Sequence, residues 1–423
     1  MAYTVLLMMN GIVFVALLSR LVSVQEFAAW NWVLAMVGLL VFSDLYLFLS
    51  LQNAITRAIS EKRTHRVALL FHNFLFLHAA VSLIFIPVLL PVIYFMPIPL
   101  EISSLSWISL GLMVSFFLAS LAVPFLVVSS AYGGNGDTDL FSRTVLIRMI
   151  AQNAVVLLFL MIGGWVAIAI PVYFLVGLAG SGIVYWYCAR YYGLKWRLPS
   201  KRKLRLTARL VLGEGQPIAW ATLKVLDSIK INFNVALGLF FVSVTVMADY
   251  ILISRLSTLV VSLMGSIMVP IVPRILTLRV AGDNKGLKDL VSKAVMLLVS
   301  FGVAASVGLV VFGGPASSLW AGRTIAYDPG YAGLIALAAF TQLMSTLFWN
   351  ILMGFDEPFQ LTMISLVSTI AYVLSLVLLI HQVAELALPL ATAIGGTVFS
   401  LGAGWRTYQH IRVTSRNSQE TGG

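Results

Sequence analysis

Long, unbroken apolar runs follow one another through most of this 423-residue chain. Windows of roughly 20 apolar residues, the length that a helix needs to cross a bilayer, give about twelve candidate spans. They cover residues 2–19, 27–51, 67–95, 106–130, 143–162, 165–188, 215–240, 246–272, 290–313, 331–354, 359–380 and 384–405. Because the runs are continuous and do not alternate between apolar and polar residues, they predict helices and exclude a membrane barrel. We therefore expect an all-α integral membrane protein.

Composition supports this prediction and limits the chemistry to expect. Hydrophobic residues make up 60% of the chain and charged residues only 10%, against roughly 25% charged residues in average soluble proteins. The formal charge of +11 is carried mostly by short loops between apolar spans, which does not favour a nucleic-acid partner. Cys188 is the single cysteine and the five histidines show no metal-binding spacing, so we expect no disulfide framework, no metal site and no cofactor.

Lysine and arginine are distributed unevenly between the two sides of the membrane that the spans define. With the N-terminus in the cytoplasm, 22 of the 27 basic residues lie in or beside inward loops, and only Arg20 and Arg323 lie in outward loops. This bias predicts that both termini are cytoplasmic. Residues 1–18 lack a basic leader and a small-residue cleavage site, so we expect a first membrane helix that is retained.

The basic segment 190–209 is the largest break in hydrophobicity and divides the spans six and six. When the chain is shifted against itself so that Val22–Val24 aligns with Val242–Val244, the loop 133–137 aligns with 353–357. Two matches at one offset favour a parallel duplication, as in transporters whose halves rock around a central site; chance matching of apolar residues is the alternative. We predict an N-terminal bundle at 1–189, a basic linker at 190–212, a C-terminal bundle at 213–405 and a cytoplasmic tail at 406–423.

One span is unusual because it carries charge near its middle. The stretch Gly215–Gly238 is long and apolar enough to cross a bilayer, yet at about 100° per residue its polar side chains share one face of about 120°. The residues of this face are Gln216, Trp220, Lys224, Asp227, Lys230 and Asn234. A charge at the membrane centre costs ~2.5 to 3.5 kcal/mol, so the face must meet protein or a water-filled cavity and not lipid.

Two interpretations of this face remain open. Asp227 lies three residues from Lys224 and from Lys230, so it can pair with either and lock the helix to a neighbour. Alternatively, the two lysines outweigh the aspartate and form the wall of a cationic cavity that attracts a diphosphate or acidic sugars. In the second interpretation, Lys224, Lys230 and Asn234 bind the substrate.

Two other spans carry candidate binding residues. Arg148 and Gln152 lie one turn apart near the cytoplasmic end of 143–162 and are candidates for the first contact with a phosphate; simple snorkelling of the arginine to the interface is the alternative. Arg255 begins a polar stripe that either faces the same cavity or bonds to neighbouring helices. The stripe continues through Thr258, Ser262 and Ser266.

Asp44 lies about eight residues, hence ~12 Å, from the cytoplasmic end of its span. We expect a carboxylate there to take up a proton or bind a cation, because an apolar environment disfavours its charge. Asp44 and Asp227 are therefore the candidates for coupling to a proton or sodium gradient. Pairing of Asp44 with a structural partner such as Arg57 is the alternative.

The order of several short motifs resembles the multidrug/oligosaccharidyl-lipid/polysaccharide exporter superfamily, and most of all its bacterial O-antigen and exopolysaccharide flippases (the Wzx type). Val24–Trp30 is similar to the family's "eeYGlW" turn, with Ala29 in place of glycine. Tyr46 likewise replaces the glycine of the following "lDlG" motif. Further similar motifs are Ser43–Leu45, Asp249–Leu256, Pro270–Arg274 and Leu319–Gly322, while Gly134–Thr138 is similar to the "GxGDT" loop of the drug-exporting branch.

This resemblance implies two six-helix bundles around a central cavity (a MATE-like fold) and no enzymatic activity. It implies a flippase that moves an undecaprenyl-diphosphate-linked oligosaccharide across the bacterial inner membrane for O-antigen, capsule or exopolysaccharide synthesis. The implied partners are this lipid-linked oligosaccharide, membrane lipids, a polysaccharide polymerase and a chain-length regulator. The alternatives are a MATE-type drug or cation exporter, a lipid II flippase, which usually carries additional helices, and a polysaccharide polymerase or ligase, which needs a large outward loop that we do not find.

Overall fold

The structure is a computed structural model that describes residues 2–40, 51, 55, 64–128, 138–191, 200, 216–268, 271–325, 328–355 and 357–420. Within these residues the chain is almost entirely helical and contains no strand. Its contacts group it into two compact units, residues 2–240 and residues 241–423, which we call the first and second unit. The predicted all-α membrane architecture is confirmed.

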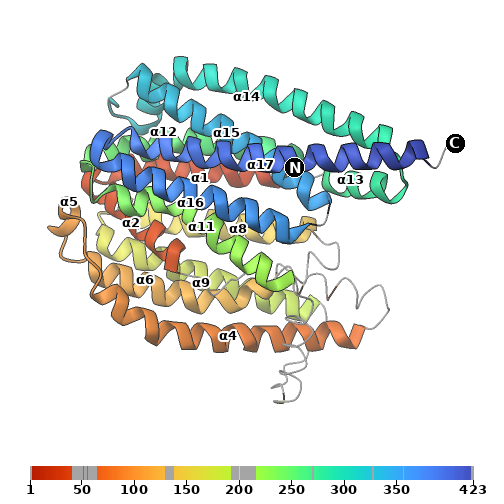
Figure 1. Ribbon diagram of the computed structural model, residues 1–423. Coiled ribbons are helices and arrows are strands. Elements are labelled where there is room, and N and C mark those ends of the chain that lie inside the picture. The colour runs from red at the N-terminus through yellow and green to blue at the C-terminus, as the bar shows by residue number, and fades with distance from the viewer. Residues whose placement is uncertain are drawn as a thin grey trace. The chain divides into compact units, whose positions relative to one another are not determined.

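The first unit contains eight α-helices and one 3₁₀ helix among the described residues (Figure 1). They are α1 (Ala2–Leu21), α2 (Val24–Leu40), α4 (Thr64–Tyr94), α5 (Leu100–Ser103), α6 (Ile108–Ala122), η2 (Val123–Leu126), α8 (Thr138–Met161), α9 (Val166–Tyr191) and α11 (Gln216–Gly238). The second unit contains α12 (Val244–Met268), α13 (Ile271–Val280), α14 (Asn284–Ala321), α15 (Pro329–Gly354), α16 (Pro358–Val383) and α17 (Ala387–Glu420).

Each predicted membrane span contains a helix of the described residues, although residues 41–50 of the span 27–51 lie outside them. Nine helices of the described chain are long and apolar enough to cross a membrane, and the three remaining predicted spans coincide with α1, α2 and α11. Hydropathy did not predict the short helices α5 and α13, nor that α17 continues as a helix through most of the predicted tail.

The helices of the second unit begin at nearly constant intervals after those of the first. The starts at Val24, Thr64 and Thr138 recur at Val244, Asn284 and Pro358, which is the same offset that aligns the two sequence matches. The starts of α6 and α9 recur at nearly this offset, at the starts of α15 and α17. This spacing supports the duplication that the sequence predicts.

Helix α11 groups with the first unit, whereas the predicted C-terminal bundle begins at residue 213. Most of the predicted linker lies outside the described residues. The division at 190–212 concerns which helices form each half of a transporter, and it stays a prediction.

Side chains near the chain turns explain where several helices begin. Ser23 and Glu26 form a reciprocal capping box at the start of α2, in which the Glu26 N–H donates to Ser23 Oγ and the Ser23 N–H donates to Glu26 Oε2, at 3.2 and 2.9 Å. Asp283 and Asp328 accept N–H bonds at the starts of α14 and α15. Pro358 lies in the first turn of α16, where its missing N–H costs nothing.

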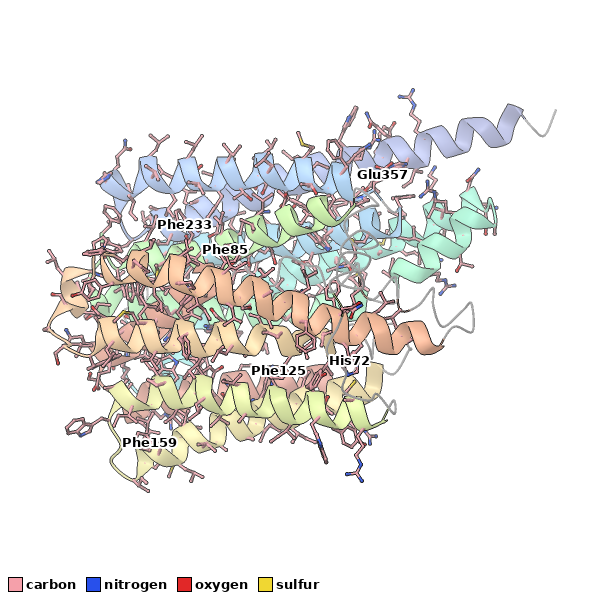
Figure 2. All side chains as sticks on the ribbon, turned by 90° about the horizontal axis from the view of Figure 1, so that it is seen from below. His72, Phe85, Phe125, Phe159, Phe233 and Glu357 are labelled. Carbon is pink, nitrogen blue, oxygen red and sulfur yellow. The ribbon has the colours of Figure 1, made fainter. Side chains whose placement is uncertain are left out.

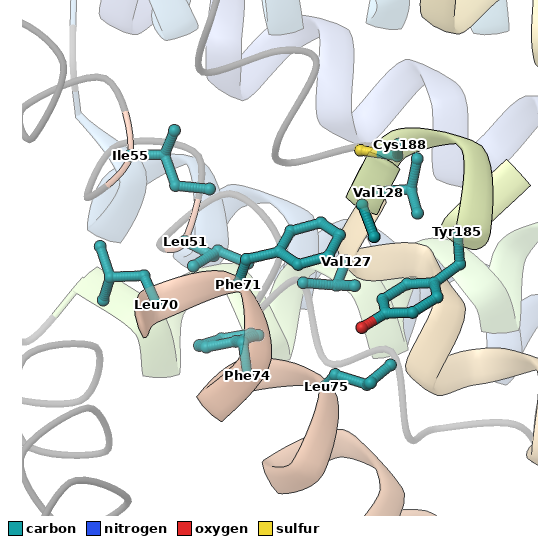
Figure 3. Close-up of a cluster of buried hydrophobic side chains, with 11 residues drawn as sticks. Leu51, Ile55, Leu70, Phe71, Phe74, Leu75, Val127, Val128, Tyr185 and Cys188 are labelled. Atoms are coloured by element: carbon teal, nitrogen blue, oxygen red, sulfur yellow. The ribbon is translucent and has the colours of Figure 1, made fainter. Parts of the chain in front are cut away.

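A buried aromatic cluster ties α4 to the η2 corner and to α9 in the first unit (Figure 3). Phe71 stacks on Tyr185 with ring centroids 5.3 Å apart, and Phe74 and the single cysteine Cys188 are fully buried beside them. Leu51 and Ile55 complete the same cluster. These contacts fix the α4 end of the unit against α9, the helix that carries part of the candidate site.

Candidate functional site

Helix α11 is held against α2 by one of its faces. The Ser228 hydroxyl donates to the Gly38 carbonyl at 2.7 Å, and the indole N–H of the fully buried Trp32 donates to the Ala236 carbonyl at 3.0 Å. Gly38 allows this close approach, because a Cβ there would come within 2.9 Å of the Asn232 amide nitrogen. Ser228, Asn232 and Ala236 recur every four residues, so they form one stripe along α11.

The predicted charged face of α11 lies on the other side of the helix from this stripe. Asp227, Lys230 and Asn234 are rotated by about 140° to 160° from its centre, given 3.6 residues per turn. Asn234 is buried, and Asp227 and Lys230 are partly buried. Asp227 interacts electrostatically with Lys230, which agrees with the pairing interpretation; a cavity wall at this face stays a prediction.

Arg148 and Gln152 connect α8 to α9 within the first unit. Arg148 Nη1 donates to the Ser181 hydroxyl at 2.7 Å, and Gln152 Nε2 donates to the Tyr173 carbonyl at 2.8 Å. Gly177 provides space for this contact, because a Cβ there would meet Gln152 Nε2 at 2.9 Å. The arginine is thus bonded to a neighbouring helix; whether it also reaches the membrane interface stays a prediction. No acidic side chain of the described chain pairs with it.

Three aromatic rings from three helices meet at Tyr173, the residue whose carbonyl accepts from Gln152. Phe14 of α1, Trp30 of α2 and Tyr173 of α9 touch one another, with centroid separations of 5.8 to 6.0 Å. Trp30 is almost fully buried. These contacts bring α1, α2, α8 and α9 together around one polar and aromatic cluster, which we call the donor cluster.

Trp30 of the donor cluster, and Asn10 and Arg148 one helical turn from its members Phe14 and Gln152, carry buried N–H groups that protein acceptors do not satisfy. Within the described chain, Asn10 Nδ2 (one turn before Phe14), Trp30 Nε1 and Arg148 Nε are buried and have no hydrogen-bond partner. Each such group costs free energy unless something accepts from it. All three are donors, so a ligand rich in oxygen acceptors fits the cluster better than a cationic one.

The duplication shows what the same helix contact looks like without a charge. At the offset that aligns the starts of α8 and α16, Arg148 corresponds to Ser368 and Gln152 to Tyr372. Ser368 is fully buried and its hydroxyl donates to the Gly395 carbonyl of α17 at 2.8 Å. The corresponding helix pair of the second unit therefore packs without a guanidinium, whereas in the first unit the stem of Arg148 packs against Gly180, where a Cβ would lie 2.6 Å from Arg148 Cγ.

In the second unit, Arg255 and Thr258 of the predicted stripe are exposed, and Ser262 is partly buried. The Thr258 hydroxyl donates to the carbonyl of Ser254 in its own helix at 2.8 Å. A shared function of this stripe stays a prediction. Asp44 and the side chains of Lys224 and Ser266 lie outside the described residues.

Sequence reasoning missed the ion pair between Asp249 and Arg323, which are 2.6 Å apart. It joins the start of α12 to the turn after α14, and the Asp249 side chain is only 6% exposed. The sequence repeat contained a hint of this ion pair, because the charged Asp249 aligns with the apolar Ala29 of the first half.

A second missed cluster lies at the turn between α15 and α16. Glu357 accepts from Arg406 at 3.3 Å and lies 2.9 Å from His410 Nε2, both on α17. Figure 2 shows Glu357 beside that helix. His410 also stacks on Phe355, whose carbonyl accepts from Arg279 of α13. These contacts fix α13 and α17 to the turn between them.

Comparison with known proteins shows the fold. No protein-family model matches the sequence, and no curated protein sequence matches it significantly. Among solved structures, the chain is similar to an inward-facing multidrug resistance MATE family transporter of the MOP superfamily, at 11% identity and a TM-score of 0.69 over 97% of this chain and 96% of that one. It is also similar to the lipid II flippase MurJ in an inward closed conformation, at 13% identity and a TM-score of 0.73 over 99% of this chain and 90% of that one.

A eukaryotic MATE transporter gives a TM-score of 0.64 at 12% identity, over 98% of this chain and 97% of that one. At these identities the likeness concerns the fold, and it extends over essentially the whole chain. The predicted resemblance to this superfamily is confirmed at that level.

Proposed function

We propose that this multi-pass membrane protein, which has the fold of the MOP superfamily transporters, is a flippase for a lipid-linked oligosaccharide. The cargo is an undecaprenyl-diphosphate-linked repeat unit, moved across the bacterial inner membrane by alternating access, with both termini cytoplasmic. A polysaccharide polymerase and a chain-length regulator are the protein partners that this function implies. The proposal involves no covalent chemistry.

The observation that carries the proposal is the partly buried guanidinium of Arg148, with which no acidic side chain of the described residues pairs. Even partial burial of a charge without a counter-charge costs free energy, and in the second unit the neutral Ser368 stands at the corresponding position. A phosphate supplies the missing counter-charge, because arginine binds phosphate oxygens through a planar, multidentate fork. A diphosphate on the cargo thereby offsets the free-energy cost of burying this positive charge.

The neutral members of the cluster suit the sugar part of the same cargo. Asn10 Nδ2 and Trp30 Nε1 are donors that hydroxyl and carbonyl oxygens satisfy. Aromatic rings such as those of Phe14 and Tyr173 offer apolar contact surface beside them. The head group thereby exchanges bonds to water for bonds to protein, which lowers the cost of its crossing.

A drug or cation exporter of the same fold is the second candidate, favoured by the similarity to MATE transporters. Such cargo calls for buried carboxylates. In the first unit, Glu26 and Glu101 lie at helix starts, so Asp227 is the only acidic side chain described in the interior of a helix. Asp227 already interacts with Lys230, and we therefore place the flippase first.

The test measures leaflet exchange of a fluorescent polyprenyl-diphosphate oligosaccharide in proteoliposomes. A membrane-impermeant quencher reports the fraction of the label in the outer leaflet. We expect Arg148→Gln to slow exchange about tenfold or more, because hydrogen bonds to a charged group are worth ~1.5–3 kcal/mol. Arg143→Gln is the matched control: it makes the same charge change on the same helix at an exposed position, and should leave the rate unchanged.

A second variant separates transport from structure. Ser181→Ala removes the hydroxyl that accepts from Arg148 but keeps the guanidinium. It should lower the thermal midpoint and keep most of the exchange rate of the folded protein. Equal loss of exchange in Ser181→Ala and Arg148→Gln would instead assign Arg148 to packing and contradict the proposal.

A further inference from the structure

One end of the second unit carries an excess of exposed positive charge. It is the end at which α13 and the start of α14 lie, together with the C-terminal part of α17 (Figure 1). Arg274 of α13 and Lys285 and Lys288 of α14 are exposed there, and we call these three residues the basic surface. No acidic side chain of the described residues pairs with them. The two lysines lie one turn apart on the same side of α14, where like charges repel each other.

The described acidic residues near the basic surface already have other partners. Asp283 caps α14 by accepting from the Gly286 N–H at 2.8 Å, and Asp289 pairs with Lys293 at 2.7 Å. Glu357 is held by the two cationic or ionisable side chains of α17 described above. The basic surface therefore has no counter-ion within the described chain, and an anion from outside the chain would offset the repulsion between its cations.

The sequence of α14 places the basic surface relative to the bilayer. After Lys293 no charged residue occurs before Arg323, and Met296 is 69% exposed, so the hydrocarbon layer begins near Lys293. At 1.5 Å per residue, Lys288 and Lys285 lie ~8 and ~12 Å beyond that level. The head-group layer is ~5–7 Å thick, lysine stems extend toward it, and the Debye length is ~8 Å. Both charges are therefore within electrostatic reach of lipid head groups.

Helix α17 gives independent evidence of a membrane boundary at this end. Trp405 and Tyr408 are 62% and 52% exposed, and their ring centroids lie 5.9 Å apart. They follow the exposed Leu401 on the same side of the helix and precede the exposed Arg412. Tryptophan and tyrosine at the end of an apolar span are typical of the membrane–water interface. This end of the second unit therefore lies at a layer of lipid head groups.

Helix α13 connects the basic surface to the turn between α15 and α16. Arg279 of α13 donates to the Phe355 carbonyl of that turn, and its guanidinium lies 5.9 Å from the centre of the Phe355 ring. Ile275 of the same helix is fully buried. His410 of α17 stacks on Phe355 with ring centroids 4.5 Å apart. A ligand that holds α13 in place therefore also stabilises the contact between this turn and α17.

We propose that the basic surface binds the head groups of acidic phospholipids and that this binding stabilises the second unit. In the proposed orientation this end faces the cytoplasm, where the inner leaflet carries acidic lipids. The three cations are exposed and spread over two helices, which suits the separate phosphates of a lipid surface. A single diphosphate is instead bound by groups that converge on it. The lipid binding does not depend on the identity of the cargo. A role of these charges in membrane insertion alone predicts no lipid dependence of the folded protein.

The first test measures lipid contact and does not require transport. A photoreactive amino acid replaces Ala281, which is exposed in the turn between α13 and α14, or, as a control, Leu297, which is exposed at the level of the hydrocarbon. The vesicles contain equal amounts of labelled phosphatidylglycerol and labelled phosphatidylethanolamine, and a trace of labelled polyprenyl-diphosphate lipid. We expect cross-linking at position 281 to favour phosphatidylglycerol about tenfold over phosphatidylethanolamine, a preference of ~1.4 kcal/mol, and cross-linking at position 297 to favour neither.

Equal cross-linking of the two phospholipids at position 281 overturns the proposal. Enrichment of the polyprenyl-diphosphate lipid above phosphatidylglycerol, relative to their mole fractions, also overturns it and assigns the surface to the cargo. The preference should disappear at ~1 M salt, because exposed charges are then screened.

The second test removes the charges. Arg274→Gln/Lys285→Gln/Lys288→Gln neutralises the basic surface, whereas the control Asp289→Asn/Lys293→Gln removes a paired anion and cation from the same helix without changing the net charge. In neutral lipid both variants should unfold at the thermal midpoint of the native chain, which shows that they fold. Phosphatidylglycerol should raise the midpoint of the native chain and of the control but not that of the triple variant. A triple variant that keeps the tenfold lipid preference or the rise in midpoint contradicts the proposal.

Discussion

Individual polar and small residues in the membrane helices have two structural roles: hydroxyl groups form hydrogen bonds between and within helices, and glycines allow helices to approach closely. Most hydroxyls are satisfied inside the helix packing: Ser345 donates to the Thr341 carbonyl at 2.8 Å and lies 3.2 Å from the Ser400 hydroxyl of α17. Glycines allow the helices to approach, as is usual where lipid offers no hydrophobic drive for association. Some buried hydroxyls of the described residues, such as those of Ser82 and Ser115, have no partner, so what distinguishes Arg148 from them is its charge.

Gly395 provides the clearest test of packing at single-residue scale. A Cβ there would lie 2.8 Å from Tyr372 Cβ and 3.3 Å from the Ser368 carbonyl oxygen. Gly395→Ala should therefore cost ~1–3 kcal/mol, as overpacking typically does, and lower the midpoint of thermal unfolding in detergent, read from tryptophan fluorescence. Gly308→Ala, which meets open space, serves as the control. A midpoint for Gly395→Ala no lower than that of the control would show that the contact is loose.

At the scale of one element, α11 presents a packing stripe and a charged face, and the two predict opposite phenotypes. Ser228→Ala removes the hydrogen bond to Gly38, so it should lower stability by ~0.5–1.5 kcal/mol and spare the exchange rate. If the charged face lines a cavity, Lys224→Ala/Lys230→Ala should abolish exchange and leave the thermal midpoint close to that of the native chain.

The same pair of measurements distinguishes the other interpretation of α11. If the lysines are only structural partners of Asp227, the double variant will be destabilised, and adding Asp227→Asn will restore part of the lost stability. Exchange by the double variant at the native rate would exclude a role of these lysines in cargo binding.

Hydropathy predicted the positions of the long helices because each needs an apolar stretch as wide as the bilayer. It did not predict α13 or the extension of α17 to Glu420, because helices outside the membrane are set by local hydrogen bonds and caps and not by hydrophobicity. Hydropathy also could not predict contacts between residues that are far apart in the sequence. Arg148 and Gln152 were identified as candidates from their spacing, but their partners Ser181 and Tyr173 lie on the next helix and required three-dimensional information.

At the scale of the whole molecule, the duplication is the most informative feature. The sequence shows only weak matches at a single offset, whereas the structure shows five helix starts that recur at nearly that offset. The repeat then serves as an internal reference, since differences between corresponding positions show where the two halves have diverged. Arg148 against Ser368 and Asp249 against Ala29 are two such differences.

The fold is shared by drug exporters and a lipid II flippase, so it does not by itself identify the cargo. The chemistry of the donor cluster does favour one class. Buried N–H groups and a guanidinium with which no carboxylate of the described residues pairs suit an anion with many oxygen acceptors, and they oppose a desolvated organic cation.

The most direct measurement therefore compares two cargoes in proteoliposomes that contain the native chain. One is a polyprenyl-diphosphate oligosaccharide and the other a fluorescent organic cation, each tested with and without imposed proton and sodium gradients. We predict protein-dependent exchange of the diphosphate lipid and no transport of the cation. Transport of the cation without exchange of the lipid would contradict the flippase and identify the protein as an exporter of cationic compounds.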